Sequence, residues 1–359
     1  MYEERVERVR SRMDEMGVDC LLLSVGADLV YLTGYDAPDL ERLTMLVLTG
    51  DQATLVVPRL EEPRVGPTEI IDEVLSWDET DEPLDLVIGR AGYARRVAVG
   101  DRTRASVLLG LQERMPGVAW SRASGVLAPL RAVKSSEEID ALARAGAAVD
   151  VVALAMRDRP FGGRAEREIQ RELGDRMLEA GHDRVDFVIV ASGPNGASPH
   201  HEAGDRLIDD GDLVVCDFGG SLGGYSSDTT RMFAVGDPPG EIAEAYTVLA
   251  EAQDEAVRAA RPGVPARDVD RTARRIIGDA GWGGNFVHRT GHGIGIETHE
   301  EPWIVAGNDT PLVAGNVFSV EPGIYVGGEW GMRLEDIVAV TDDGPLRLTV
   351  SPRDIAVVE

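Results

Sequence analysis

Carboxylates stand inside apolar, strand-like runs of this sequence, and a chain that buries such runs must neutralise the charges they carry. Asp217 closes the run LVVCD, Glu321 closes FSVE, and Glu335 lies in RLEDIVAV. An ionised carboxylate in a buried strand is costly unless it is paired or bound to a metal. The fold is therefore restricted to one whose strands bring these acids together with cations.

The acids form two pairs, and each pair flanks a glycine-rich turn. Asp217 and Asp228 lie on either side of SLGG, while Glu321 and Glu335 are symmetric about Gly328 in GGEWG. Residues at equal distances from the turn of a β-hairpin lie opposite each other. We therefore predict two hairpins, each of which presents a pair of carboxylates.

Histidines are confined to the same part of the chain. All six lie beyond residue 180, and His288, His292 and His299 occur together in HRTGHGIGIETHEEP. Four opposed acids and the glycine-flanked His292 predict a metal site with hard, oxygen-rich ligands, which suits Mn²⁺, Co²⁺ or Fe²⁺ better than a structural zinc. Five side chains exceed the usual protein share of one ion, so we predict two ions. His182, in the polar turn GHDR, is expected at the surface.

The chain is predicted to contain two domains. Residues 1–125 read as α/β, because a charged helix over residues 2–17 precedes short apolar runs such as CLLLS and ATLVVP. A proline-containing connector over 126–134 leads to Ser135 and Glu138, a capping box that opens a long helix. The second domain, 135–359, is predicted to be α+β, with further helices near 164–180, 240–260 and 266–280 and a strand in DFVIVASG.

The motifs of the second domain resemble those of one metallopeptidase family. D217-x10-D228, the block HRTGHGIGIETHE, E321-P-G and R333-L-E-D are similar to the family with the pita-bread fold, which contains aminopeptidase P, prolidase and methionine aminopeptidase. Residues 1–125 resemble the N-terminal domain of the branch formed by aminopeptidase P, prolidase and creatinase. The resemblance implies a curved antiparallel sheet covered by helices. It also implies five metal ligands: Asp217, Asp228, His292, Glu321 and Glu335.

The same resemblance implies roles on the substrate side of the metals. His200 and His299 match histidines that bind the substrate and stabilise the oxyanion, while His288 matches a position that lines the pocket and His201 has no assigned role. Glu321 is expected to relay a proton to the leaving nitrogen.

Two further side chains are expected near the site. Arg333 should orient the carboxylates, with a purely structural ion pair as the alternative, and Trp303 should contact the substrate, with a place in the core as the alternative. Two divalent ions, Mn²⁺ first and Co²⁺, Fe²⁺ or Zn²⁺ as alternatives, would activate water for attack on the scissile carbonyl.

These implications favour an exopeptidase that hydrolyses Xaa-Pro bonds. Prolidases resembling this chain carry an arginine after the HE-x-P block, suited to the carboxylate of a dipeptide, whereas residues 299–320 here contain no basic residue. We therefore expect an enzyme like aminopeptidase P, which acts on longer peptides, with prolidase as the alternative. More distant alternatives are a creatinase-like C–N hydrolase of a small non-peptide substrate and a non-catalytic binding module.

Charge excludes several partners. The 359 residues include 63 acidic and 36 basic ones, a net charge of −27, and Lys134 is the single lysine. Such a surface repels nucleic acid and anionic membranes.

Without a signal peptide or an apolar run of roughly 20 residues, a cytoplasmic location is expected. We hypothesise a high-salt cytoplasm, with an arginine-favouring genome as the alternative, and by resemblance we expect a homodimer.

Overall fold

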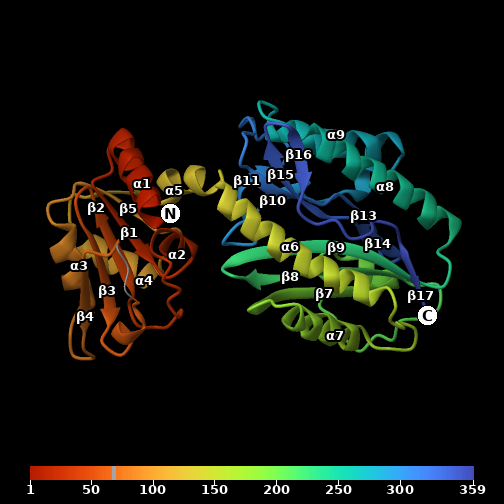
Figure 1. Ribbon diagram of the computed structural model, residues 1–359, viewed down its shortest axis with the longest axis horizontal. Coiled ribbons are helices and arrows are strands. Elements are labelled where there is room, and N and C mark those ends of the chain that lie inside the picture. Colours follow the sequence, from red (N-terminus) through yellow and green to blue (C-terminus); the bar gives the residue numbers. More distant parts are fainter. Residues whose placement is uncertain (67–69) are drawn as a thin grey trace. The chain divides into compact units, whose positions relative to one another are not determined.

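The computed structural model describes residues 1–66 and 70–359, which divide into two units, Met1–Arg131 and Ala132–Glu359 (Figure 1). Mixed sheets with helices on their faces build both units. The predicted fold class, an α/β unit followed by an α+β unit with antiparallel sheets under helices, is confirmed. None of the helices in these residues has the length and apolarity that crossing a membrane requires.

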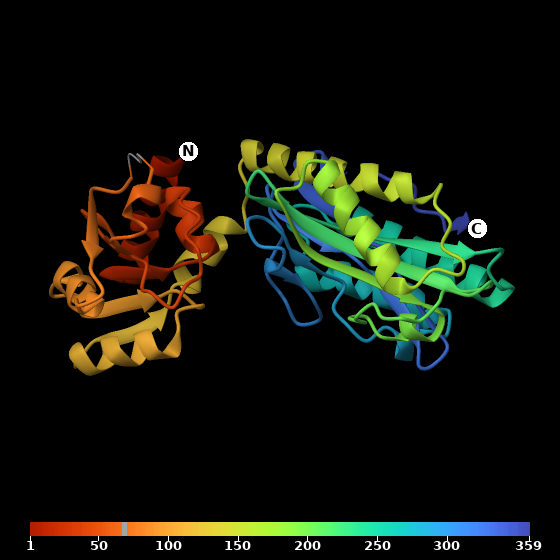
Figure 2. The same ribbon diagram turned by 90° about the horizontal axis from the view of Figure 1, so that it is seen from below.

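A six-stranded sheet in the order β4-β3-β2-β1-β5-β6 forms the centre of the first unit. Its strands are β1 (Cys20–Ser24), β2 (Met45–Thr49), β3 (Ala53–Pro58), β4 (Glu73–Trp77), β5 (Arg96–Val99) and β6 (Ala119–Arg122). The apolar runs are buried on both sides because helices cover both faces (Figure 2). The helices are α1 (Tyr2–Met16), α2 (Ala27–Thr33), α3 (Pro83–Ala91), α4 (Ala105–Arg114) and α5 (Ser124–Arg131).

Helix α5 covers much of the segment 126–134, where the sequence suggests a connector, and Pro129 lies inside it. The next helix, α6 (Ser136–Met156), begins where the capping box predicts. The Ser135 hydroxyl accepts a hydrogen bond from the Glu138 backbone N–H at 3.3 Å, and the Glu138 carboxylate accepts one from the Ser135 N–H at 3.0 Å.

The second unit is built on two sheets and an added hairpin. One sheet has the order β17-β9-β8-β7, the other β11-β10-β12-β15-β16, and β13 pairs with β14. The strands are β7 (Arg184–Ser192), β8 (Leu213–Leu222), β9 (Tyr225–Val235), β10 (Gly291–Gly293), β11 (Glu300–Ile304), β12 (Val317–Val320), β13 (Gly323–Val326), β14 (Trp330–Arg333), β15 (Asp336–Thr341), β16 (Gly344–Arg347) and β17 (Ala356–Val358).

Helices enclose these sheets from two sides (Figure 1). Helices α6 and α7 (Glu166–Glu179) pack against β7, β8, β9 and β17 in one apolar cluster. Helices α8 (Gly240–Ala259) and α9 (Ala266–Asp279) pack in a second cluster, which also contains side chains of β12 and β15. The strands that carry the predicted site residues therefore lie between two helical layers.

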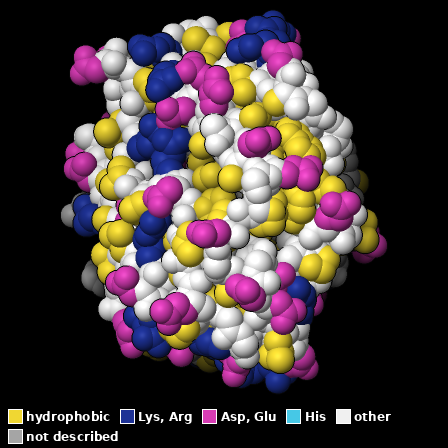
Figure 3. Space-filling model, turned by 90° about the vertical axis from the view of Figure 1, so that its right-hand side faces the viewer, with side chains coloured by type: hydrophobic (Ala, Val, Ile, Leu, Met, Phe, Trp, Pro, Cys, Tyr) yellow, Lys and Arg dark blue, Asp and Glu magenta, His cyan; other side chains and the backbone are white. Residues whose placement is uncertain are grey.

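The acidic composition is visible at the surface. On the face shown in Figure 3, Asp and Glu side chains are scattered among arginines. Exposed pairs such as Arg90 with Glu73, at 2.7 Å, contribute little to stability because water and salt screen them. Such pairs leave the net charge of −27 in place.

Candidate active site

The first predicted hairpin is formed by β8 and β9. Its turn is at residues 223–224, where both glycines have positive φ angles of 59° and 82°. Asp217 pairs with Thr230, and Asp228 pairs with Gly219. The turn lies slightly later than predicted, so the two aspartates are neighbours on the diagonal instead of direct partners. Because residues 217 and 219 share a face of the strand, both carboxylates still lie on one side of the sheet.

The second predicted hairpin has the predicted register. The β13–β14 ladder pairs Gly323 with Arg333, and the β12–β15 ladder pairs Val320 with Asp336, so both ladders are symmetric about position 328. Glu321 and Glu335 lie at the break between the two ladders. Their side chains are therefore free to leave the sheet and enter a cavity.

His292 is the central residue of β10, and glycines on both sides allow this strand to approach its neighbours closely. A Cβ atom at Gly291 would collide with the backbone oxygen of Ser319, and one at Gly293 would collide with the backbone of Glu301. The His292 backbone N–H donates to the Ser319 hydroxyl at 3.0 Å. The glycines thus fix the position from which the imidazole enters the site.

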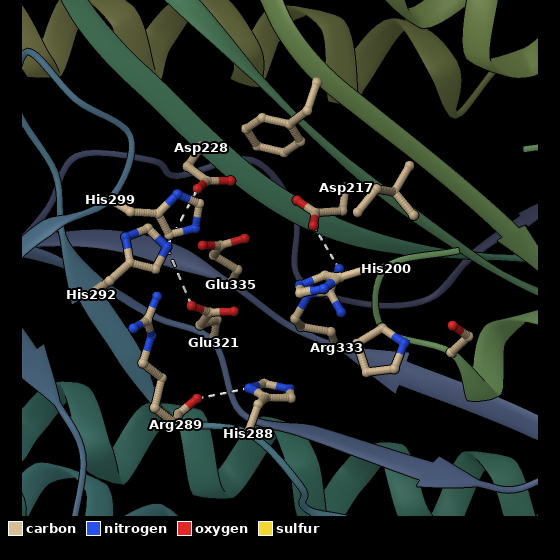
Figure 4. A pocket seen from close by; sticks show the side chains of 14 residues that line it. His200, Asp217, Asp228, His288, Arg289, His292, His299, Glu321, Arg333 and Glu335 are labelled. Carbon is tan, nitrogen blue, oxygen red and sulfur yellow. Dashed lines mark hydrogen bonds and ion pairs between the residues drawn. The ribbon is translucent and has the colours of Figure 1, made fainter. Parts of the chain in front are cut away.

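The two hairpins and β10 meet at one cavity of about 710 Å³ (Figure 4). His292 Nε2 lies 3.3 Å from Glu321 Oε1 and 3.6 Å from Asp228 Oδ2. Asp228, His292 and Glu335 offer donor atoms that all lie within 4.8 Å of one another. Among the described residues, Asp217 Oδ1 and Glu335 Oε1 are buried without a hydrogen-bond partner. All five predicted ligands therefore line one cavity, and two of their oxygens lack a hydrogen-bond partner among the described residues.

The electrostatics of this cluster call for a cation. Burial, together with the charges of neighbouring carboxylates, raises the pKa of Asp228 and of Glu335 well above the ordinary values. Burial raises the pKa of Glu321 to about 7. Burial lowers the pKa of His292 to about 3, so its ring is neutral and able to donate a lone pair. Hard oxygen donors with one imidazole fit divalent ions of the Mn²⁺ type.

Arg333 joins the two hairpins behind the carboxylates. Its guanidinium donates to Asp217 Oδ2 at 2.5 Å, to the Tyr325 hydroxyl at 2.8 Å and to Thr230 Oγ1 at 3.1 Å. The Thr230 hydroxyl in turn donates to Glu335 Oε2 at 2.8 Å. Arg333 thus has the contacts expected of a residue that orients carboxylates, and Thr230 and Tyr325 are partners that the sequence did not indicate.

The predicted histidines lie around the same cavity. His200 lines it with an exposed side chain, and the His299 ring centroid is 4.1 Å from that of His292. His288 is held by two hydrogen bonds: Nδ1 donates to the Arg289 carbonyl at 2.7 Å, and Nε2 accepts from the Tyr325 hydroxyl at 2.9 Å. Because Nδ1 faces a carbonyl, it carries the proton and Nε2 accepts.

Trp303 does not line the cavity. The guanidinium of Arg289 lies over the Trp303 ring, with Cζ 4.3 Å from the ring centroid. Arg289, in turn, lines the cavity. Arg289 lies before His299, outside the segment 299–320 in which a carboxylate-binding arginine was expected. The signal that could have found it is its position inside the HRTGH block.

Two histidines have partners that the sequence did not indicate. His182 was expected at the surface, and this is wrong: it is buried, with Nδ1 3.1 Å from the Met177 carbonyl and Nε2 2.8 Å from the Ser227 hydroxyl. His201 binds Glu166 Oε2 at 2.8 Å. These polar partners compensate the burial of each ring.

Comparison with known proteins places this site in a family. Residues 140–342 match the model of metallopeptidase family M24, and residues 5–133 match the creatinase/prolidase N-terminal domain. The chain belongs to metallopeptidase family M24. It is therefore a metal-dependent peptidase, and the family implies divalent metal ions.

Relatives in the M24 family match over their whole lengths. The probable dipeptidase PepE of Mycobacterium tuberculosis is 44% identical, over 100% of this chain and 97% of its own. The Xaa-Pro dipeptidase of Pyrococcus furiosus is 33% identical, over 98% and 99%. The crystal structure of a prolidase from Thermococcus sibiricus superimposes with a TM-score of 0.94, at 36% identity and over 99% and 98% of the two chains.

Proposed function

We propose that this M24 protein is an Xaa-Pro dipeptidase, a prolidase, that works with two divalent ions. The observation that carries the proposal is the convergence of four carboxylates and a neutral imidazole on one cavity. The dipeptidase names of whole-length relatives support our alternative, prolidase, over the aminopeptidase P that the sequence analysis placed first. A volume of about 710 Å³ is in the range of small-ligand pockets, roughly 300–1,000 Å³, and suits a dipeptide.

The chain's own residues would divide the work as follows. Asp217, Asp228, His292, Glu321 and Glu335 would hold the ions, with Mn²⁺ as the first candidate and Co²⁺, Fe²⁺ or Zn²⁺ as alternatives. Bound divalent ions supply Lewis acidity toward a carbonyl and lower the pKa of water.

Three side chains would act on the substrate. His200 and His299 would hydrogen-bond the scissile group and stabilise the oxyanion, since both line the cavity with exposed side chains. A carboxylate oxygen of Glu321 would hold the proton destined for the leaving proline nitrogen. His288, fixed by Tyr325, would shape the pocket wall.

The test compares kcat/KM for Ala-Pro, Ala-Pro-Ala and Ala-Ala. A dipeptidase specific for Xaa-Pro should prefer Ala-Pro over both other peptides, should lose activity with a chelator and should regain it with Mn²⁺ or Co²⁺. A clear preference for Ala-Pro-Ala would support aminopeptidase P instead. Equal rates with Ala-Ala would show that proline is not recognised.

A further inference from the structure

Among the described residues that line the cavity, Arg289 is a charged side chain that neither a hydrogen bond nor an ion pair joins to the carboxylate cluster. It is half-buried, it lines the cavity beside His288, and Figure 4 shows its guanidinium pointing toward His292 and Glu321. The second arginine of the cavity, Arg333, donates to three acceptors. Arg289 has no comparable set of acceptors, so we look for its role in the molecule that enters the cavity.

The guanidinium of Arg289 has no acceptor in the described part of the chain. Within residues 1–66 and 70–359 it forms neither an ion pair nor a hydrogen bond, and its contact is with the face of the Trp303 ring at 4.3 Å. Burial lowers its pKa, which means that the surroundings disfavour the charge. The Glu321 carboxylate favours the charge of the guanidinium, yet no acid of the described residues forms an ion pair with it. A partly desolvated cation in this position can receive an anion that enters the cavity.

The backbone that carries Arg289 is held in place from helix α9. Asp270 Oδ1 accepts hydrogen bonds from the Thr290 N–H at 3.2 Å and the Thr290 hydroxyl at 2.8 Å. Arg274 donates to the Phe286 carbonyl at 3.0 Å and to the His288 carbonyl. Residues on both sides of Arg289 are therefore tied down, while its own side chain is left available. This is the arrangement of a preorganised binding group.

We propose that Arg289 binds the C-terminal carboxylate of the dipeptide and that Trp303 holds the guanidinium in position for it. The inference rests on the proposed dipeptidase function, because a dipeptide carries its carboxylate one residue beyond the scissile bond. A planar guanidinium pairs with a carboxylate through two parallel hydrogen bonds, and stacking on an aromatic ring fixes its plane. Trp303 thus acts as a positioning residue one step removed from the substrate.

The experiment compares Ala-Pro with its C-terminal amide, which is the same molecule without the negative charge. In Arg289→Gln the KM for Ala-Pro should rise about 10- to 100-fold, the range expected when a charge-assisted hydrogen bond is lost. The kcat/KM for the amide should change less than about twofold. Arg289→Lys should recover only part of the loss, because an ammonium group is a point charge without the bidentate fork.

The controls separate this role from a structural one. Arg275→Gln makes the same change at an exposed position on α9 and should leave both substrates unaffected. Trp303→Leu should raise the KM for Ala-Pro selectively, and Trp303→Phe should preserve a ring and most of the affinity. Metal content should remain that of the wild type in all of these variants.

The outcomes distinguish the two proposals. If the wild type prefers Ala-Pro but Arg289→Gln leaves its KM unchanged, or weakens the acid and the amide equally, the assignment of Arg289 is wrong while the dipeptidase stands. If the wild type itself prefers Ala-Pro-Ala, the proposed function fails and the carboxylate assignment fails with it.

Discussion

Replacing Glu321 by glutamine should stabilise the metal-free protein at neutral pH, although it removes a proposed metal ligand. Burial raises the pKa of Glu321 from an ordinary value of 4.5 to about 7. The folded metal-free protein therefore keeps a proton on Glu321 at pH values where the unfolded chain has lost it. The contribution of this group to the free energy of unfolding is highest below pH 4.5, falls between pH 4.5 and about 7, and is constant above that.

The magnitude follows from the same pKa values. At about 1.36 kcal/mol for each pKa unit, a rise from 4.5 to about 7 corresponds to roughly 3 kcal/mol of lost stability at pH 8. Glutamine has no proton to lose, so it avoids this cost. Burial lowers the pKa of His288 to about 4 and that of His292 to about 3. These two shifts reduce the free energy of unfolding as the pH falls below about 6.5, which is opposite to the effect of Glu321. These histidines are present in both proteins, and their effects cancel in the difference.

The measurement is urea unfolding of wild type and Glu321→Gln in a chelator at several pH values from 5 to 8. Between pH 5 and pH 8 the free energy of unfolding of the variant should rise by roughly 2.5 kcal/mol relative to that of the wild type. Glu329→Gln, the same change in the exposed turn of the same hairpin, should show a difference that does not vary with pH. If the free energies of unfolding of wild type and Glu321→Gln changed with pH in parallel, the reasoning would be refuted. Saturating Mn²⁺ should then reverse the order, because binding stabilises only the folded protein with its full ligand set.

Four further predictions concern ligands, catalysis, salt and assembly. Asp228→Asn and Glu335→Gln should each lower metal occupancy, measured by elemental analysis of purified protein, because a neutral amide is a weaker ligand; full occupancy in both would show that the proposed ligand set is wrong. His299→Ala should reduce kcat about 100-fold or more while metal content stays full, and loss of metal would make the residue a ligand instead. Unfolding in rising KCl should show a stability gain of several kcal/mol if the net charge of −27 is an adaptation to salt, whereas full stability without salt would exclude that idea. Light scattering at working salt should give the mass of a homodimer, and a monomer would contradict the expectation from resemblance.

The sequence predicted the carboxylate hairpins because their geometry is local. Symmetry about Gly328 predicted that Glu321 and Glu335 would meet, and two ladders share that centre. The first hairpin was also predicted, but its register was not. Two adjacent glycines allow the turn to form at more than one position of SLGG, and pairing with β7 on the other side of β8 contributes to the choice.

Contacts between distant segments could not be predicted from spacing. Arg289 meets Trp303 because β10 and β11 pair in a ladder with an irregular register, which a one-dimensional pattern does not reveal. Tyr325 reads as an ordinary strand residue, yet it links Arg333 to His288. His182 lies in a polar sequence but is buried, because its partner Ser227 comes from a strand 45 residues away.

A second set of buried acids explains how loops can carry the proposed active site. Glu166 is fully buried at the start of α7, and it accepts hydrogen bonds from the Ser192 N–H at 2.8 Å, the Asn195 amide at 3.0 Å and the His201 ring at 2.8 Å. These contacts hold both ends of the segment between Ser192 and His201. His200 belongs to this segment and lines the cavity.

Asp336 is likewise a buried acid that binds groups around a proposed site residue, here Glu335. It is fully buried and binds Arg231 at 2.7 Å, Arg347 at 3.0 Å and Gln253 at 3.0 Å, while Arg231 also donates to the Glu335 carbonyl at 2.5 Å. Asp270 plays the corresponding part beside Arg289. In each case a buried acid satisfies groups that flank a proposed site residue, so that residue keeps its own donors and acceptors for the proposed metal or peptide. The rigidity that results lowers the conformational entropy lost when a small substrate binds, which matters most for a dipeptide because it offers few contacts.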